Sequence, residues 1–222
     1  MEENTRETIA QDLLDIGAVF LRPEEPFTWA SGIHSPIYTD NRLILSAPAV
    51  RERVEQAIAD TVKRCFPNAE MLMGTATAGI AHAALAASLL HLPMGYVRSS
   101  NKSHGRENRI EGKLTAGERV VVIEDLISTG GSVLDVVHAL QEAGAEVLGI
   151  VCIFTYGMQK SKDALAVEKL TMESLTDFDT ILEVAAQTGR LQTQQIPKLK
   201  QFRDHPANES WMAGIARTKK EE

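Results

Sequence analysis

Short apolar segments that alternate with helical patterns constrain the fold of this chain more than any other feature. The apolar segments are Met71–Met73, Met94–Val97, Arg119–Ile123 and Val147–Phe154. Helical patterns follow the first and the third of them, over Ile80–Leu90 and Ser132–Glu142. Apolar strands that alternate with helices are typical of a parallel sheet covered on both faces. We therefore predict an α/β fold in which helices flank a central parallel sheet.

Composition limits the classes of function that such a fold can serve. The net charge is −7, so a general attraction to nucleic acid or to an anionic membrane is not expected. No apolar run approaches the ~18 residues of a membrane span, and the polar, acidic first residues do not resemble a signal peptide. The two cysteines, Cys65 and Cys152, have no metal or redox spacing, which favours a reducing compartment. We expect a cytoplasmic protein with neither nucleic-acid nor membrane partners.

The segment Val120–Ser132 carries the clearest chemistry, because parallel sheets bind ligands beyond the carboxyl ends of their strands. Its sequence, VVVIEDLISTGGS, places Glu124 and Asp125 directly after a strand and a glycine pair before a helix. Glycines let backbone N–H groups approach a phosphate, and a helix N-terminus attracts negative charge. Two acids would repel that phosphate unless they bind the hydroxyls of an attached sugar or hydrated Mg²⁺. The whole segment indicates a ribose phosphate site, whereas the acid pair alone is better explained as a solvated turn.

This segment resembles the signature of the type I phosphoribosyltransferases, a family that uses 5-phosphoribosyl 1-pyrophosphate (PRPP). In that family the acid pair holds the ribose hydroxyls and the loop holds the 5′-phosphate. The resemblance implies a type I phosphoribosyltransferase-like sheet with a small N-terminal hood, and it implies that Asp125 is catalytic. The PRPP-binding residues that it implies here are Glu124, Asp125, Leu126, Ile127, Ser128, Thr129, Gly130, Gly131 and Ser132.

A second signal is the polar, aperiodic segment that follows Val97. A loop of about 20 residues inside a compact domain is typically a lid or a binding loop, although a solvated excursion explains this one equally well on its own. Its first residues, RSSNKSHG from Arg98, are similar to the Arg-Lys-Glu-x-Lys-x-His-Gly loop of the orotate phosphoribosyltransferases, with Ser99 in place of the first Lys. The resemblance implies that Arg98, Lys102 and His104 contact pyrophosphate in a neighbouring subunit's site, and that Lys102 matters most for rate.

Two further segments resemble the orotate phosphoribosyltransferases, and each lacks a lysine that relatives carry. FTWASGIHSPIYTDNR, over Phe27–Arg42, is similar to the family's hood over the base, with Ala30 where the family has Lys. GTATAGI, over Gly74–Ile80, is similar to its pyrophosphate loop, with Ala78 where some members have Lys. Gly157 stands where some relatives carry an Arg that reads the orotate carboxylate.

The ligand of that carboxylate stays open between Ser128, Arg42 and loop N–H groups. Only Ser128 has support from the family, so Ser128 is the orotate-binding residue that the resemblance implies.

The resemblance as a whole implies an enzyme that converts orotate and PRPP to orotidine 5′-monophosphate and pyrophosphate in pyrimidine synthesis. It implies a homodimer with shared active sites. It also implies Mg²⁺ as cofactor, held mainly through substrate and water, with no direct protein ligands. We expect a single domain over residues 1–222, with the hood over roughly 1–45, the core over roughly 46–185 and a tail over roughly 186–222.

Two alternatives stay open at this point. One is a phosphoribosyltransferase for a purine or a different pyrimidine, against which the hood and the loop with Lys102 and His104 argue. The other is a regulator that keeps the PRPP site as a sensor and binds nucleic acid or a partner. Such a regulator should show an added domain, a basic face or a decayed catalytic loop, and the chain shows none of these in its sequence.

Overall fold

A six-stranded sheet forms the centre of the protein. The computed structural model describes residues 3–28, 32–98 and 109–212. The strand order is β10 (Met172–Asp177), β9 (Glu146–Thr155), β8 (Arg119–Ile127), β5 (Met71–Thr75), β6 (Met94–Val97) and β7 (Ile110–Glu111). The first five strands in this order are parallel, and β7 runs antiparallel to β6 at the edge. The predicted α/β fold with a central, largely parallel sheet is confirmed.

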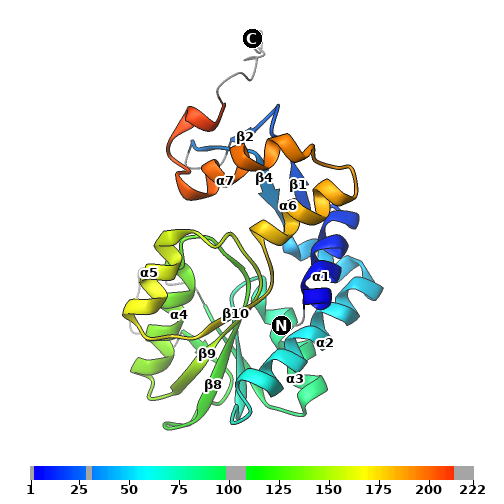
Figure 1. The fold of residues 1–222 in the computed structure, drawn as a ribbon. Helices are drawn as coiled ribbons and strands as arrows, with labels where there is room; N and C mark the ends of the chain where they lie inside the picture. Colours follow the sequence, from blue (N-terminus) through cyan, green and yellow to red (C-terminus); the bar gives the residue numbers. More distant parts are fainter. Residues whose placement is uncertain (1–2, 29–31, 99–108, 213–222) are drawn as a thin grey trace, which may run out of the picture.

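Helices cover both faces of this sheet (Figure 1). The helices α1 (Glu3–Asp15), α2 (Pro48–Cys65) and α3 (Gly79–Leu90) lie on one face, and α4 (Gly131–Glu142) and α5 (Gln159–Val167) lie on the other. Successive side chains of a strand point to opposite faces, so β8 supplies both layers. Val121 and Ile123 pack into the core beneath α1, α2 and α3, and Val120 and Val122 pack into the core beneath α4. The apolar run of this strand is continuous because both of its faces are buried.

The N-terminal segment that follows α1 (residues 19–28 and 32–46) and the C-terminal segment (residues 178–212) lie together above the sheet in Figure 1. The N-terminal segment contains two short antiparallel pairs and a 3₁₀ helix, and the C-terminal segment contains two α-helices and two 3₁₀ helices. The pairs are β1 (Val19–Leu21) with β4 (Ile37–Thr39), and β2 (Phe27–Thr28) with β3 (His34–Ser35). The helices are η1 (Asn41–Ser46), α6 (Phe178–Gln187), η2 (Thr193–Gln195), α7 (Ile196–Asp204) and η3 (Glu209–Met212).

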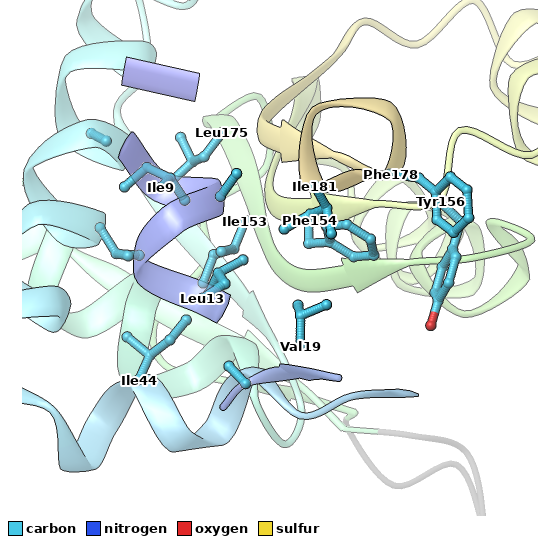
Figure 2. Close-up of a cluster of buried hydrophobic side chains, with 14 of the residues drawn as sticks. Ile9, Leu13, Val19, Ile44, Ile153, Phe154, Tyr156, Leu175, Phe178 and Ile181 are labelled. Atoms are coloured by element: carbon cyan, nitrogen blue, oxygen red, sulfur yellow. The ribbon is translucent and has the colours of Figure 1, made fainter. Parts of the chain in front are cut away.

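One hydrophobic core joins these terminal segments to the sheet. Figure 2 shows Ile9 and Leu13 of α1 beside Ile153 of β9, and Phe178 of α6 near Phe154. The same core extends to Trp211 near the C-terminal end, which is 1% exposed. This continuity supports our proposal that the whole chain is one domain.

Three segments differ from the sequence-based expectations. The strand expected to end at Ile123 continues to Ile127, because its last residues pair with Phe154 and Thr155 of β9. The expected loop after Val97 is shorter than 20 residues, because Ile110 pairs with Val97 to form a hairpin. The unit β10–α6 was not expected, and the described part of the tail packs on the core through Leu199, Phe202 and Trp211. No helix among the described residues is long and apolar enough to cross a membrane.

Candidate active site

The carboxyl ends of β5 and β8 and the start of η1 enclose a cavity of about 300 Å³. Its lining consists of Thr39, Asp40, Asn41, Arg42, Thr77, Ala78 and Asp125. Asn41 fixes one wall to the sheet, because its side-chain Nδ2 donates a hydrogen bond to the backbone oxygen of Asp125 at 2.7 Å. A larger hollow of about 510 Å³, lined by residues such as Arg22 and Arg190, shares no residue with this cavity and lacks the acid pair.

The two acids at the end of β8 occupy different environments. Glu124 is buried, and its Oε1 accepts hydrogen bonds from the Thr75 hydroxyl at 2.6 Å and from the backbone N–H of Asp125 at 3.0 Å. Asp125 is half-buried and lines the cavity. Only Asp125 is therefore placed to meet a ligand in the cavity directly.

Burial raises the pKa of Glu124 to about 8, the hydrogen-bonded side chain of Asp125 raises it as well, and the hydrogen bond from Thr75 opposes both. Near neutral pH Glu124 is therefore largely protonated and adds little negative charge beside the cavity. A neutral Glu124 tolerates a nearby phosphate better than an ionised one does.

Replacing Glu124 with Gln is expected to stabilise the protein increasingly as the pH rises. Below about pH 4.5 the folded and the unfolded chain both hold the Glu124 proton, so the substitution has little effect. Between this value and a folded-state pKa of about 8, the unfolded chain releases the proton first, so the wild-type protein loses stability as the pH rises. Glutamine has no such penalty and still accepts the Thr75 hydrogen bond. We expect a gain in the free energy of unfolding on the order of a few kcal/mol at pH 9 and little gain at pH 5.

Urea unfolding at pH 5, 7 and 9 measures this gain. Glu183→Gln, at an exposed position on α6, is the matched control and should show no such trend. A gain for Glu124→Gln that is the same at pH 5 and pH 9 would contradict the buried, protonated state.

The loop between β8 and α4 is built to approach an anion. Gly130 has φ = 85° and is the N-cap of α4, a conformation that glycine adopts without strain. A Cβ added at Gly131 would have no atom within 4 Å, so the backbone is open there. The first N–H groups of a helix have no carbonyl partner within it, and the helix dipole makes this end positive. Ser128, Thr129 and Ser132 are half-buried or exposed around this opening.

Leu126 and Ile127, which the resemblance implies as PRPP-binding, have side chains in the two cores. The Ile127 backbone oxygen is already occupied by the N–H of Tyr156 at 3.0 Å and the hydroxyl of Thr155 at 3.2 Å. These two residues therefore position the loop, whereas Ser128 to Ser132 offer the groups that a phosphate requires.

The loop between β5 and α3 lies beside the acid pair. A Cβ at Gly74 would lie 2.8 Å from the backbone oxygen of Gly79, and a Cβ at Gly79 would lie 2.5 Å from that of Ile123. Both positions thus require glycine, and the start of α3 packs directly on β8. The peptide bond between Ala76 and Thr77 is cis. Thr77 and Ala78, the N-cap of α3, both line the cavity, so the positive end of α3 faces it.

The base of the loop after β6 is fixed by hydrogen bonds and ion pairs. The N–H of Arg98 donates to the backbone oxygen of Arg109 at 2.8 Å, and Arg98 Nε lies 3.3 Å from Glu111 Oε1. Arg109 pairs with Asp135 in the second turn of α4, which connects this base to the helix that begins at the phosphate loop. Two residues implied by the resemblance, Lys102 and His104, lie outside the described residues.

Sequence reasoning missed Thr75 and Asn41, which hold the acid pair. The signal for Thr75 is the strand register, because Gly74 pairs with Ile123 and the next residues along the two strands are Thr75 and Glu124. Asn41 offered no such signal, since it acts from outside the sheet. Gly157 has φ = 64° and provides no side chain for an orotate carboxylate.

A parallel sheet with an acid pair and a helix-capping phosphate loop at one strand end defines the class of the phosphoribosyltransferases. The family model described as phosphoribosyl transferase domain matches residues 41–186. The chain belongs to the orotate phosphoribosyltransferase family. It is 58% identical to the orotate phosphoribosyltransferase of Bacillus subtilis over 93% of this chain and 95% of that protein. It is 52% identical to that of Halalkalibacterium halodurans over 93% and 99% of the two chains.

Solved structures agree with this assignment. The crystal structure of orotate phosphoribosyltransferase from Aeropyrum pernix matches with a TM-score of 0.73 at 28% sequence identity. The match covers 82% of this chain and 99% of that one.

Proposed function

We propose that this chain is a pentosyltransferase that moves the phosphoribosyl group of PRPP to orotate, giving orotidine 5′-monophosphate and pyrophosphate. The observation that carries the proposal is that Asp125 and the N-terminus of α3 line one cavity, while the strand that carries Asp125 leads into the phosphate loop and the N-terminus of α4. PRPP has a phosphate at each end of a ribose that bears two hydroxyls. The two helix N-termini suit the phosphate ends, and the carboxylate of Asp125 suits the hydroxyls.

The mechanism follows from the charge that develops during transfer. As the C1–O bond of the ribose stretches, negative charge grows on the departing diphosphate and the ring becomes oxocarbenium-like. The carboxylate of Asp125 accepts hydrogen bonds from the ribose hydroxyls, and its negative charge stabilises the positive charge that develops on the ring. Donors at the N-terminus of α3, together with Lys102 and His104, offset the charge on the departing oxygens, an electrostatic stabilisation of the transition state. Orotate N1, whose proton is released to water, attacks the opposite face of C1, and the electron pair of the breaking C1–O bond leaves with the diphosphate.

We propose that Mg²⁺ binds here together with the substrate, mainly through the substrate's phosphates and water. Among the described residues, no group of three or more His, Cys, Asp or Glu side chains is placed to hold a metal ion. Mg²⁺ commonly binds through one or two carboxylates, waters and substrate phosphates, and Asp125 is a suitable carboxylate on the cavity wall. When bound with PRPP, the ion would neutralise part of the charge on the diphosphate.

Two parts of the proposal rest on the family resemblance. We propose a homodimer in which Lys102 and His104 reach the partner's site, and we propose Ser128 as a contact of orotate. We also propose a cytoplasmic location, which the two cysteines support because neither forms a disulfide.

A base-selection assay tests the function. The full chain is mixed with Mg²⁺, PRPP and one base at a time, and the loss of base absorbance is followed together with pyrophosphate release. We expect both signals with orotate and neither with uracil or adenine. Turnover of another base would make the chain a phosphoribosyltransferase of different specificity, and PRPP binding without turnover of any base would support a sensor.

Asp125→Asn is expected to lower kcat/KM for PRPP about tenfold to hundredfold while the fold remains intact. The substitution keeps the shape of the side chain but removes the negative charge of the group that accepts hydrogen bonds from the ribose hydroxyls. A hydrogen bond to a charged group is worth about 1.5–3 kcal/mol. Steady-state kinetics with varied PRPP measure the effect. Asp163→Asn, on the exposed face of α5, is the control and should behave as the wild type. Unchanged kinetics in a folded Asp125→Asn protein would remove Asp125 from the site.

A further inference from the structure

Arg42 is the only positively charged side chain among the described residues that line the active-site cavity. Its guanidinium is held in place by Asp40, which accepts from Arg42 Nε at 2.6 Å and from Arg42 Nη2 at 2.8 Å. Asp40 is also the N-cap of η1 and accepts from the backbone N–H of Arg42 at 3.2 Å. The residue is thus fixed at both its backbone and its side chain.

The two hydrogen bonds to Asp40 leave one edge of the Arg42 guanidinium available for a ligand. A guanidinium has five N–H donors in one plane, and Asp40 uses two of them. The hydrogen bonds from the Arg42 side chain lower the pKa of Asp40, so the clamping carboxylate stays ionised. The Arg42 side chain is 66% exposed, so its remaining donors are accessible to a ligand. A planar pair of donors held in this way is suited to the oxygens of a phosphate or a carboxylate.

The opposite side of the cavity also favours an anion. Thr77 and Ala78 lie at the start of α3, whose positive end faces the same space as Arg42. Neither residue carries a charge. The cation in this cavity is therefore supplied by η1 rather than by the loop at which some relatives carry a lysine.

The hydrogen-bond acceptors that line the cavity indicate which chemical group is attached to that anion. Asp125 supplies a carboxylate, and Asn41 supplies a buried side-chain oxygen, Oδ1, with no hydrogen-bond partner among the described residues. Asn41 is 1% exposed. Both groups accept hydrogen bonds, so the ligand portion beside them must donate, as hydroxyls do. An anion next to hydroxyl groups is the chemistry of a sugar phosphate, and in PRPP the diphosphate on C1 is adjacent to the C2 hydroxyl.

Building on the proposed function, we propose that Arg42, held by Asp40, binds the diphosphate of PRPP opposite the N-terminus of α3. A diphosphate carries two or more negative charges and needs donors from more than one element, as this cavity provides. A single carboxylate, such as that of orotate, would need only the Arg42 edge.

Equilibrium binding to the full chain in the presence of Mg²⁺ tests this role, with PRPP, pyrophosphate and ribose 5-phosphate as separate probes. Arg42→Ala should weaken PRPP and pyrophosphate binding about tenfold to hundredfold, because it removes charge-assisted hydrogen bonds. Ribose 5-phosphate, which lacks the diphosphate, should bind within about twofold of the wild type. Arg42→Lys should recover part of the affinity, since lysine keeps the charge but loses the planar pair of donors. Asp40→Asn should weaken pyrophosphate binding by freeing the guanidinium.

Arg64→Ala, an exposed arginine of α2 outside this cavity, is the matched control. Thermal unfolding of each variant shows whether it folds. Unchanged pyrophosphate binding by folded Arg42→Ala overturns the inference, and a raised KM for orotate with unchanged pyrophosphate binding assigns Arg42 to the carboxylate instead. If the wild-type chain binds PRPP and turns over orotate in those cases, only this inference fails. If the wild-type chain does neither, the proposed function fails.

Discussion

Lys102→Ala is expected to lower kcat roughly 10²–10³-fold, the loss typical of removing one preorganised group that stabilises transition-state charge. Mixing this variant with Asp125→Asn is then expected to restore activity. If Lys102 acts in the partner's site, a mixed dimer contains one site with both defects and one site with neither. Half of the dimers are mixed after random exchange at equal amounts, so about a quarter of the sites regain both residues.

The measurement is specific activity after subunit exchange, with exchange followed separately by a tag on one variant. Lys102→Ala mixed with Lys102→Gln is the matched control and should stay inactive under both arrangements. If Lys102 acts in its own subunit, every site keeps one defect and the first mixture shows only the mean of the two variants' own residual activities. Demonstrated exchange without recovery would reject the shared site and leave the enzyme assignment intact.

Gly130→Val is expected to weaken the binding of ribose 5-phosphate by about hundredfold or more. Gly130 has φ = 85°, which a β-branched residue strongly disfavours. The loop must leave the conformation that presents the first N–H groups of α4. Losing two hydrogen bonds to a charged group, at about 1.5 kcal/mol or more each, corresponds to at least about hundredfold in affinity.

A second glycine separates strain from binding. Gly117 has φ = 83°, a Cβ there would have no atom within 4 Å, and it precedes β8 at the opposite end of the sheet. Gly117→Val should lower the melting temperature yet bind ribose 5-phosphate as the wild type does. Calorimetric titration of both variants decides the question, and tight binding by folded Gly130→Val would place the phosphate cradle elsewhere.

The sequence alone predicted those strands whose residues are apolar and buried on both faces of the sheet. The strand containing Val121 and Val122 could be predicted because both of its faces are buried, so the apolar run is unbroken. The strand β10 could not, because it lies at the edge of the sheet and pairs only with β9. Its buried residues include polar Ser174 and Thr176 beside Leu175, so no apolar run marks this strand in the sequence.

The candidate site shows the same division. The acid pair and the phosphate loop are contiguous in sequence, so their residue types alone indicated a ribose phosphate. The contacts that assign different roles to Glu124 and Asp125 come from Thr75 and Asn41, which are 49 and 84 residues away along the chain from the acids they contact. Such contacts depend on strand register and on how η1 packs against the sheet, and no local pattern encodes them.

The close backbone approaches at Gly74 and Gly79 also bear on how this site can diverge. These glycines interlock β5, α3 and β8 through main-chain atoms, so a side chain at either position would displace the strand that carries the acids. Ala78 and Arg42, by contrast, line the cavity. A charge can therefore move between these two positions during evolution without a change in the backbone. A library that seeks new anion preference should vary positions 42 and 78 together and leave both glycines unchanged.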